Sequence, residues 1–239
     1  MKGLLFFSAW SRAWWNVVPT QQAIARIAEE SSRGIMGQLA NTEYDPYLSL
    51  GEESVEKMIE KEREDFAEIL RRLGANKEIM EFLFLKYRME KVAREIKARL
   101  FDGKEAEGLN DPEVEKGIKA KPADQTKVDD WAIRRFEDLS TEKARKLGDG
   151  RLAEQLKSLF LTRRAMRKEG LEDGVVLRKL EDAFLMEVDL TNGSLAPLMA
   201  LMVRKMRAER MIRTAVGARR FGFNLVDVQY EVSKIRGII

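Results

Sequence analysis

Residues 197–220 read PLMALMVRKMRAERMIRTAVGARR, and this stretch predicts one long helix. Pro197 stands near its start, where the missing N–H of proline removes no helical hydrogen bond. Apolar side chains recur at helical spacing along it, and its methionines are expected to fill a core. The larger of these apolar residues are Leu198, Leu201, Met202, Met206 and Ile212, followed by the smaller Ala215. The glycine-containing segment 221–224 then ends the pattern.

The same periodicity predicts further helices on both sides of this stretch. They cover residues 20–40, 54–73, 77–100, 152–168, 175–189 and 225–239, with another between Trp131 and a break at Gly148. Asp45-Pro46 marks a break, because a residue before proline is biased away from helix. Residues 102–130 are poor in large apolar side chains and are interpreted as a connector, in part extended. The sequence therefore predicts an all-α protein.

Composition excludes several classes of site. The chain of 239 residues is long enough for one large domain or two small ones, and it contains no cysteine and no histidine. Disulfides, thiolate nucleophiles, imidazole bases and the usual zinc sites are therefore absent. Carboxylates, lysines, tyrosines and hydroxyls remain as possible catalysts. We accordingly predict no catalytic, cofactor-binding or metal-binding residues.

The N-terminus, MKGLLFFSAWSRAWW, is apolar and aromatic, yet it lacks the pattern of a cleaved signal peptide. No stretch approaches the roughly 20 apolar residues that span a bilayer. The favoured interpretation is a core anchor, since buried aromatic side chains are common. The alternative is docking on a partner or a membrane surface through Trp10, Trp14 and Trp15.

Charge is the second strong feature of residues 197–220. Seven cations stand there against a single acid, Glu209, although the whole chain has a net charge of only +3. One interpretation is an interface for an acidic partner. Its candidate residues are Arg204, Arg207, Arg210, Arg213, Arg219 and Arg220. The other is a solvated face with Glu209 and Arg213 as a pair. The acid-rich stretch 52–68 is expected to complement this helix within the fold, rather than to face a basic partner.

Two long segments resemble each other. A shift of 119 residues places Lys86 on Lys205 and Arg94 on Arg213, and a shift of 121 aligns the helices that precede them. Such self-similarity predicts duplicated antiparallel helix units, although helical periodicity alone also produces matches of this kind. The corresponding domains are residues 1–103, a reduced middle over 104–174, and residues 175–239.

Three segments resemble the rotor-socket subunit of the V-type and A-type rotary ATPases, called subunit d in vacuolar enzymes. Residues 39–44, LANTEY, resemble the family's L-x-x-T-x-Y stretch, and residues 55–100 are similar to one of its helical repeats. The proline-led helix at Pro197, with Ile212-Arg213-Thr214-Ala215 and the basic end Arg219-Arg220-Phe221-Gly222, looks like the last repeat. Met211 replaces the usual asparagine, and two units stand where family members carry three.

The resemblance implies an elongated or funnel-like helical subunit of the central stalk, without catalytic activity of its own. Such a subunit links the rotor shaft to the membrane rotor ring and transmits torque for proton or sodium transport. Its expected partners are those shaft subunits and that ring, with no nucleic acid and no small-molecule substrate. Its expected location is peripheral, at the cytoplasmic face of a membrane.

Two alternative functions remain open, each from a different class of protein. The first is a nucleic-acid-binding protein that uses the basic helix over residues 204–220, with Trp14 and Trp15 as stacking groups. The second is a helical enzyme that uses only glutamate or lysine, which requires a perturbed side chain in a deep pocket.

Overall fold

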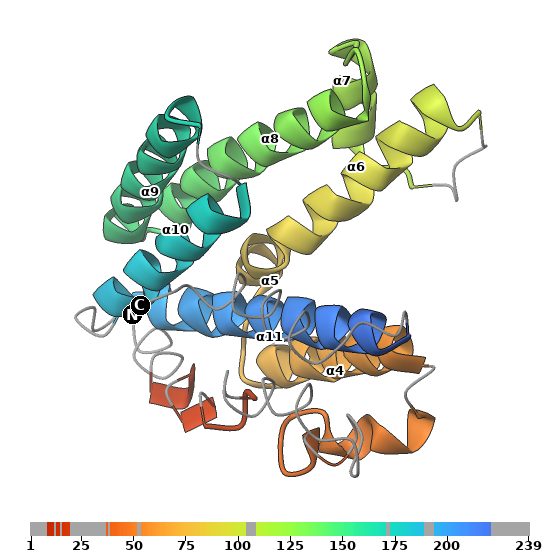
Figure 1. Ribbon diagram of the computed structural model, residues 1–239. Coiled ribbons are helices and arrows are strands. Elements are labelled where there is room, and N and C mark those ends of the chain that lie inside the picture. Colours follow the sequence, from red (N-terminus) through yellow and green to blue (C-terminus); the bar gives the residue numbers. More distant parts are fainter. Residues whose placement is uncertain are drawn as a thin grey trace. The chain divides into compact units, whose positions relative to one another are not determined.

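The computed structural model describes residues 9–11, 13, 14, 16–19, 37, 39–51, 54–103, 109–170, 173–188 and 194–220. Every regular element in these residues is helical, which confirms the predicted all-α class. The chain forms two compact units, one of residues 1–74 and 161–239 and one of residues 75–160 (Figure 1). The three-part division and the repeated helix pairs inferred from the sequence stay predictions.

In the described part of the first unit, the longer elements are the 3₁₀ turn η1 (Asp45–Leu50) and the helices α4 (Val55–Arg72), α10 (Asp173–Val188) and α11 (Ala196–Arg220). The second unit contains α5 (Lys77–Leu83), α6 (Leu85–Phe101), α7 (Pro112–Lys119) and α8 (Gln125–Lys146). The next helix, α9 (Gly150–Lys168), begins in the second unit and ends in the first. None of the described helices is apolar and long enough to cross a bilayer.

Most of the helices expected from the sequence are present. Those over 54–73, 152–168, 175–189 and 197–220 are confirmed as α4, α9, α10 and α11, and a φ of +89° at Gly74 follows the end of α4. The helix predicted over 77–100 is interrupted at Phe84, between α5 and α6. The predictions for 20–40 and 225–239 lie almost wholly outside the described residues.

The connector predicted over residues 102–130 is wrong for much of its length. Two aspartates within this segment start helices: Asp111 accepts a hydrogen bond from the N–H of Glu113 at 3.0 Å, and Asp124 accepts one from the N–H of Lys127 at 2.8 Å. A carboxylate in this position satisfies an N–H that has no helical partner. Helices α7 and α8 therefore begin there, although α7 and the first turn of α8 have few large apolar side chains.

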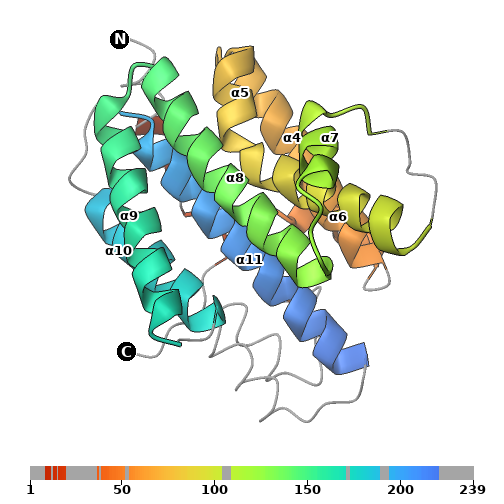
Figure 2. The same ribbon diagram turned by 90° about the horizontal axis from the view of Figure 1, so that it is seen from above.

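A small apolar core unites the second unit. Helices α6 and α8 pack along each other, and α7 contacts both (Figure 1 and Figure 2). The core is formed by buried side chains of these helices, and Trp131, Phe136 and Leu139 pack against it. Its buried members are Leu85, Met89, Val92, Ala93, Ile96, Val114, Val128 and Ala132.

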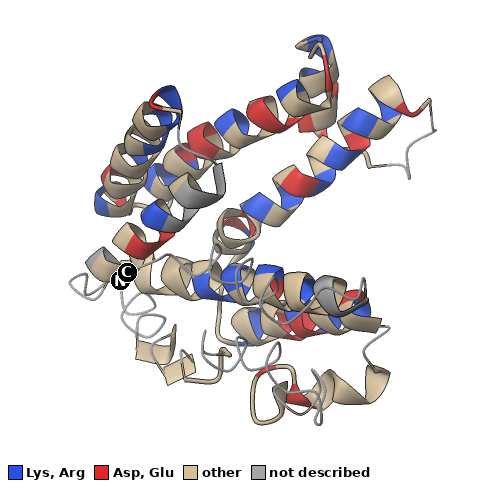
Figure 3. Ribbon diagram, viewed as in Figure 1, with Lys and Arg blue, Asp and Glu red and all other residues tan. Residues whose placement is uncertain are grey.

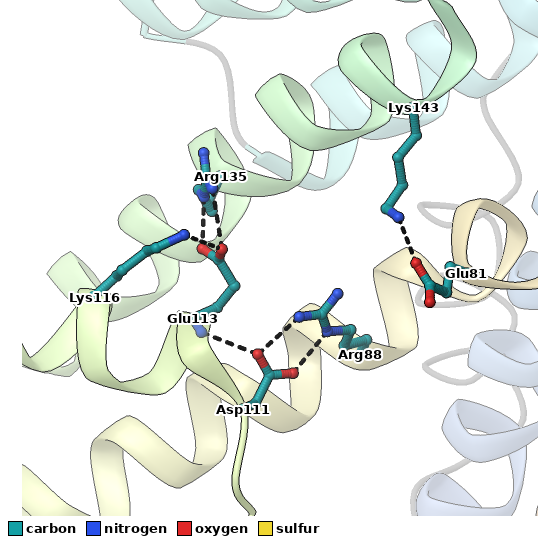
Figure 4. Close-up of polar contacts among 7 residues, drawn as sticks. All are labelled: Glu81, Arg88, Asp111, Glu113, Lys116, Arg135 and Lys143. Carbon is teal, nitrogen blue, oxygen red and sulfur yellow. Dashed lines mark hydrogen bonds and ion pairs between the residues drawn. The ribbon is translucent and has the colours of Figure 1, made fainter. Parts of the chain in front are cut away.

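Ion pairs reinforce the same helix contacts at the surface of this core (Figure 4). Arg88 of α6 donates two hydrogen bonds to Asp111, at 2.6 and 2.8 Å, so the residue that starts α7 is tied to α6. Glu113 of α7 accepts from Arg135 of α8, which holds the pKa of its carboxyl below the usual value. These bonds join elements that the apolar core already brings together.

Gly117 allows the close approach of α7. A Cβ atom there would overlap Ile96 Cδ1 and lie 3.0 Å from Trp131 Cζ3. Ile96 is fully buried and has little room to move. We expect Gly117→Ala to lower the free energy of unfolding by about 1–3 kcal/mol, the usual cost of overpacking. Urea denaturation measures the change.

Gly150→Ala is the matched control, because no atom lies within 4 Å of the Cβ that it adds. A gain in helix propensity, smaller than the about 1 kcal/mol of a helix interior because Gly150 is the first residue of α9, is then expected without a clash. Equal effects of the two substitutions would contradict the close packing of α7.

Candidate functional site

The basic helix α11 is a buried element of the first unit. Its methionines are buried, which confirms the prediction that they fill a core; they are Met199, Met202, Met206 and Met211. Three charged side chains are buried among them: Lys205, Arg207 and Glu209. Helix α10 contacts α11, and so does α4, which lies beside it in Figure 1.

Lys205 is the most enclosed of these charges, with 1% of its side chain exposed. Its Nζ donates to Glu43 Oε2 at 2.6 Å and to Glu62 of α4. The same ammonium lies 4.3 Å from the centroid of the Phe66 ring. A buried charge is tolerated only with such partners. One cation therefore joins α11 both to α4 and to the turn before η1.

Two further ion pairs extend this contact along α4. Arg63 donates to Glu209 at 2.6 Å, and the guanidinium of Arg213 binds Glu56 at 2.8 Å. Arg213 also lies 3.5 Å from Glu209, which confirms the predicted pair within α11. The expectation that the acid-rich stretch complements the basic helix within the fold is therefore confirmed. Glu209 is buried, so this face of α11 is not solvated.

Arg207 and Arg210 bind acids of α10 instead. Arg207 donates to Glu181 at 3.1 Å and to Asp182 at 2.7 Å. Arg210 donates to both carboxylate oxygens of Glu181, at 2.6 and 2.8 Å. Two guanidinium groups therefore share one largely buried carboxylate, and α10 is tied to α11 by charge as well as by packing.

The spacing of the charged residues along α11 explains why they form ion pairs with both α4 and α10. Residues advance by about 100° around a helix, so Lys205, Glu209 and Arg213 fall within an arc of about 80°. Arg207 and Arg210 lie about 140–200° from Lys205, on the other side of α11. The helix thus presents one charged stripe to α4 and a second to α10.

Burial perturbs both carboxylates that face Lys205. It raises the pKa of Glu62 to about 7, because the loss of solvent outweighs the attraction of the lysine. The pKa of Glu43 is raised for the same reason. Two buried carboxylates opposite one ammonium carry an excess negative charge, and proton uptake relieves it.

The N-terminal aromatic residues pack onto this cluster. The rings of Trp10 and Trp14 are 5.0 Å apart, and they lie 6.0 and 6.4 Å from buried Phe66. Trp10 and Trp14 are half-buried and contact a core side chain, which is consistent with the predicted anchor, whereas Trp15 lies outside the described residues.

The six arginines predicted to form an interface differ in their contacts within the chain. Arg207, Arg210 and Arg213 bind acids within the chain, and Arg204 is half-buried. Arg219 and Arg220 are the last two residues of α11, and their side chains are outside the described part of the structure. That these residues contact a partner stays a prediction.

Lys205 is the central residue that the sequence interpretation left out of the candidate set. A signal was present, because Lys205, Glu209 and Arg213 recur every four residues, opposite the acid-rich stretch. Among the residues that the structure describes, no group of three or more acidic side chains could hold a metal ion.

Comparison with known proteins adds no constraint: no family model, no curated protein and no solved structure matches this chain.

We expect Lys205→Met to lower the free energy of unfolding by about 3–5 kcal/mol near pH 7, because it leaves two buried carboxylates without their cation. The loss should be smaller at pH 5, where those carboxylates take up protons. Urea denaturation at both pH values measures it. Lys57→Met removes an exposed lysine from α4 and should change stability by less than about 0.5 kcal/mol. Comparable effects of the two variants would refute a buried ion cluster.

The raised pKa of Glu62 predicts an unusual pH dependence. Its folded-state pKa of about 7 exceeds the ordinary value of 4.5, so the folded protein holds a proton that the unfolded chain has lost. The contribution of this proton to the free energy of unfolding therefore falls as pH rises from about 4.5 to about 7, at about 1.4 kcal/mol per pH unit. Below about pH 4.5 the carboxyl is protonated in both the folded and the unfolded state, so this contribution no longer depends on pH.

Comparison of the wild-type protein with Glu62→Gln isolates this effect. The variant should gain stability relative to the wild type between about pH 5 and pH 7, since it carries no carboxylate at this position. Glu43 still pairs with Lys205 in the variant, and Glu209 still pairs with Arg63, so both proteins share the other ionisable groups. Glu60→Gln removes an exposed carboxylate from the same helix and serves as control. A stability difference that is flat across this range would contradict the prediction.

Proposed function

We propose that this chain is a non-catalytic central-stalk subunit of a V-type or A-type rotary ATPase. In this role it links the rotor shaft to the membrane rotor ring and transmits torque. The proposal starts from the resemblance of residues 39–101 and 175–239 to the rotor-socket subunit of those enzymes. Its expected position is peripheral, at the cytoplasmic face of the membrane.

The observation that carries the proposal is the double anchoring of α11. Lys205, Glu209 and Arg213 fix it to the α4 side, and Arg207 and Arg210 fix it to α10. A body that transmits torque needs helices that do not slide past one another. Ion pairs on two faces of one helix resist sliding, because any shift in register separates several buried charges at once.

The helix bounds lend further support. The segment from the start of α5 to the end of α6 covers residues 77–101, and α11 covers residues 196–220. Both ends differ by the same 119 residues, which is the shift that aligns the two segments in sequence. Equal lengths are expected of duplicated helical units.

The internal ion pairs narrow the partner surface that we propose. Arg207, Arg210 and Arg213 are engaged within the first unit, so we place the partner contact at the basic C-terminal end of α11, at Arg219 and Arg220. The same pairing weakens the nucleic-acid alternative, because three cations expected to bind phosphates already bind acids. A gel shift at about 50 mM salt that shows a salt-sensitive complex would favour that alternative.

We expect the tagged chain to be recovered from detergent-solubilised membranes of its source organism together with ATPase shaft subunits and the rotor ring, at about 0.1 M salt. Arg219→Ala/Arg220→Ala should lower the recovered amounts severalfold, since two contact cations are lost. Lys57→Ala/Lys61→Ala removes the same charge from the exposed side of α4 and should retain both partners. Mass spectrometry of the eluate measures each subunit, and the absence of both partners would overturn the proposal.

A further inference from the structure

A segment near the N-terminus contacts the buried ion cluster around Lys205. We call residues 9–19, as far as the structure describes them, the N-terminal strap. The N–H of Glu43 donates to the carbonyl oxygen of Val17 at 3.0 Å, and Val18 is buried with 6% of its surface exposed. The strap is therefore bound through its backbone to Glu43, the residue whose carboxylate also holds Lys205.

Side-chain contacts join the strap to the same cluster. The rings of Trp10 and Trp14 lie 6.0 and 6.4 Å from the ring of Phe66. The ammonium of Lys205 lies 4.3 Å from the centroid of that ring. Burial raises the pKa of the Glu43 carboxyl, and both Lys205 and the nearby indole of Trp14 oppose this rise. The strap and the ion cluster therefore share Phe66 and Glu43.

The cluster contains more negative than positive charge. Figure 3 shows acidic residues of α4 alongside the basic residues of α11. Three enclosed carboxylates face two cations: Glu43, Glu62 and Glu209 against Lys205 and Arg63. Among the residues that the structure describes, the buried atoms Glu43 Oε1 and Glu62 Oε2 have no hydrogen-bond partner. One proton on this pair of carboxyls removes the excess charge and converts an unbonded acceptor into a donor.

The other ionisable groups near the cluster do not neutralise this excess. They are Tyr44 and Tyr47, Asp65 of α4, and the ion pair of Arg213 with Glu56. Burial and the Asp65 carboxylate raise the pKa of Tyr47, so this phenol stays neutral up to alkaline pH. The described residues of the strap have no ionisable side chain. The excess charge is therefore relieved either by a proton or by solvent.

We propose that the N-terminal strap is a pH-operated latch, which stays closed on the ion cluster while the cluster holds a proton and opens when that proton is lost. Opening admits water to the carboxylates of Glu43 and Glu62, and water solvates their excess charge. It also exposes the rings of Trp10 and Trp14, so a change of pH becomes an exposed aromatic surface. This inference goes beyond the proposed rotor function and does not depend on it.

The strap is the part of this arrangement that opens most easily. Helices α4 and α11 are joined by further ion pairs, such as that between Arg63 and Glu209. The described strap is attached to the cluster through the backbone hydrogen bond to Glu43 and through aromatic contacts with Phe66. Segments with few buried contacts open at a lower free energy than the helices on which they lie.

The direction of the response follows from the pKa of Glu62. Burial raises this pKa to about 7 in the closed form, and it returns toward the ordinary value of 4.5 where water reaches the carboxyl. Between these two values the closed form holds a proton that the open form has lost. The ratio of open to closed strap therefore rises by up to about tenfold per pH unit in this range, and it is constant above about pH 7.

The experiment measures thiol labelling, which is specific to one position because the chain has no cysteine. Val18→Cys places a buried thiol in the strap, and a pyridyl disulfide reaches it only after opening. Asn16→Cys places an exposed thiol two residues away, so the ratio of the two labelling rates cancels the pH dependence of the thiol reaction itself. We expect this ratio to rise by up to about tenfold per pH unit between about pH 5 and pH 7, and to level off above about pH 7.

Two further variants test the origin of the response. In Glu62→Gln the ratio should be nearly independent of pH, since Lys205 then pairs with the carboxylate of Glu43 alone. Glu60→Gln removes an exposed carboxylate from the same helix and should leave the response unchanged. A ratio that is flat while Glu62 is present, or one that still rises in Glu62→Gln, would overturn the proposal.

Urea denaturation of Val18→Cys separates opening of the strap from unfolding of the whole unit. The free energy of opening obtained from the labelling rate should be clearly smaller than the free energy of unfolding of the same variant. Equal values at every pH would show that the thiol is reached only through global unfolding, and they would overturn the latch. The urea midpoint of each variant also verifies its folding.

Discussion

The first unit depends on one buried ammonium group. Lys205 has 1% of its side chain exposed, and it is held by Glu43, by Glu62 and by the face of Phe66. An unpaired charge at this depth would cost several kcal/mol, so the fold is stable only when α4, α11 and the turn at residues 39–44 meet in one arrangement. The cluster therefore specifies the register of these segments more than it adds stability.

The remaining ion pairs of α11 follow from this register. Glu209 and Arg213 lie one and two turns beyond Lys205 on the same stripe, so they reach Arg63 and Glu56 on α4, whose residue numbers mostly fall as those of α11 rise. The two helices are therefore antiparallel. The opposite stripe meets α10 through Glu181. The second unit is held together differently. Its ion pairs lie at the surface of an apolar core, and that core would bring the helices together without them.

The sequence predicted helices well where apolar side chains were frequent and periodic, as in α4, or frequent on several sides, as in α11, and failed where capping decided the outcome. Residues 112–119 contain few large apolar side chains, and their start depends on the Asp111 carboxylate and on Pro112, which also read as a break. The site was predictable in part. The acid-rich stretch and the basic helix were matched correctly by charge, but periodicity cannot show that a helix is buried on several sides, so Lys205 and Glu209 were not distinguished from surface charges.

Burial, rather than the number of cations, decides whether a basic helix is left to meet a partner. Helix α11 is strongly basic in sequence, yet acids of α4 and α10 bind most of its described cations. A basic stretch read from a sequence is therefore evidence for an interface only after the acids of the same chain have been placed.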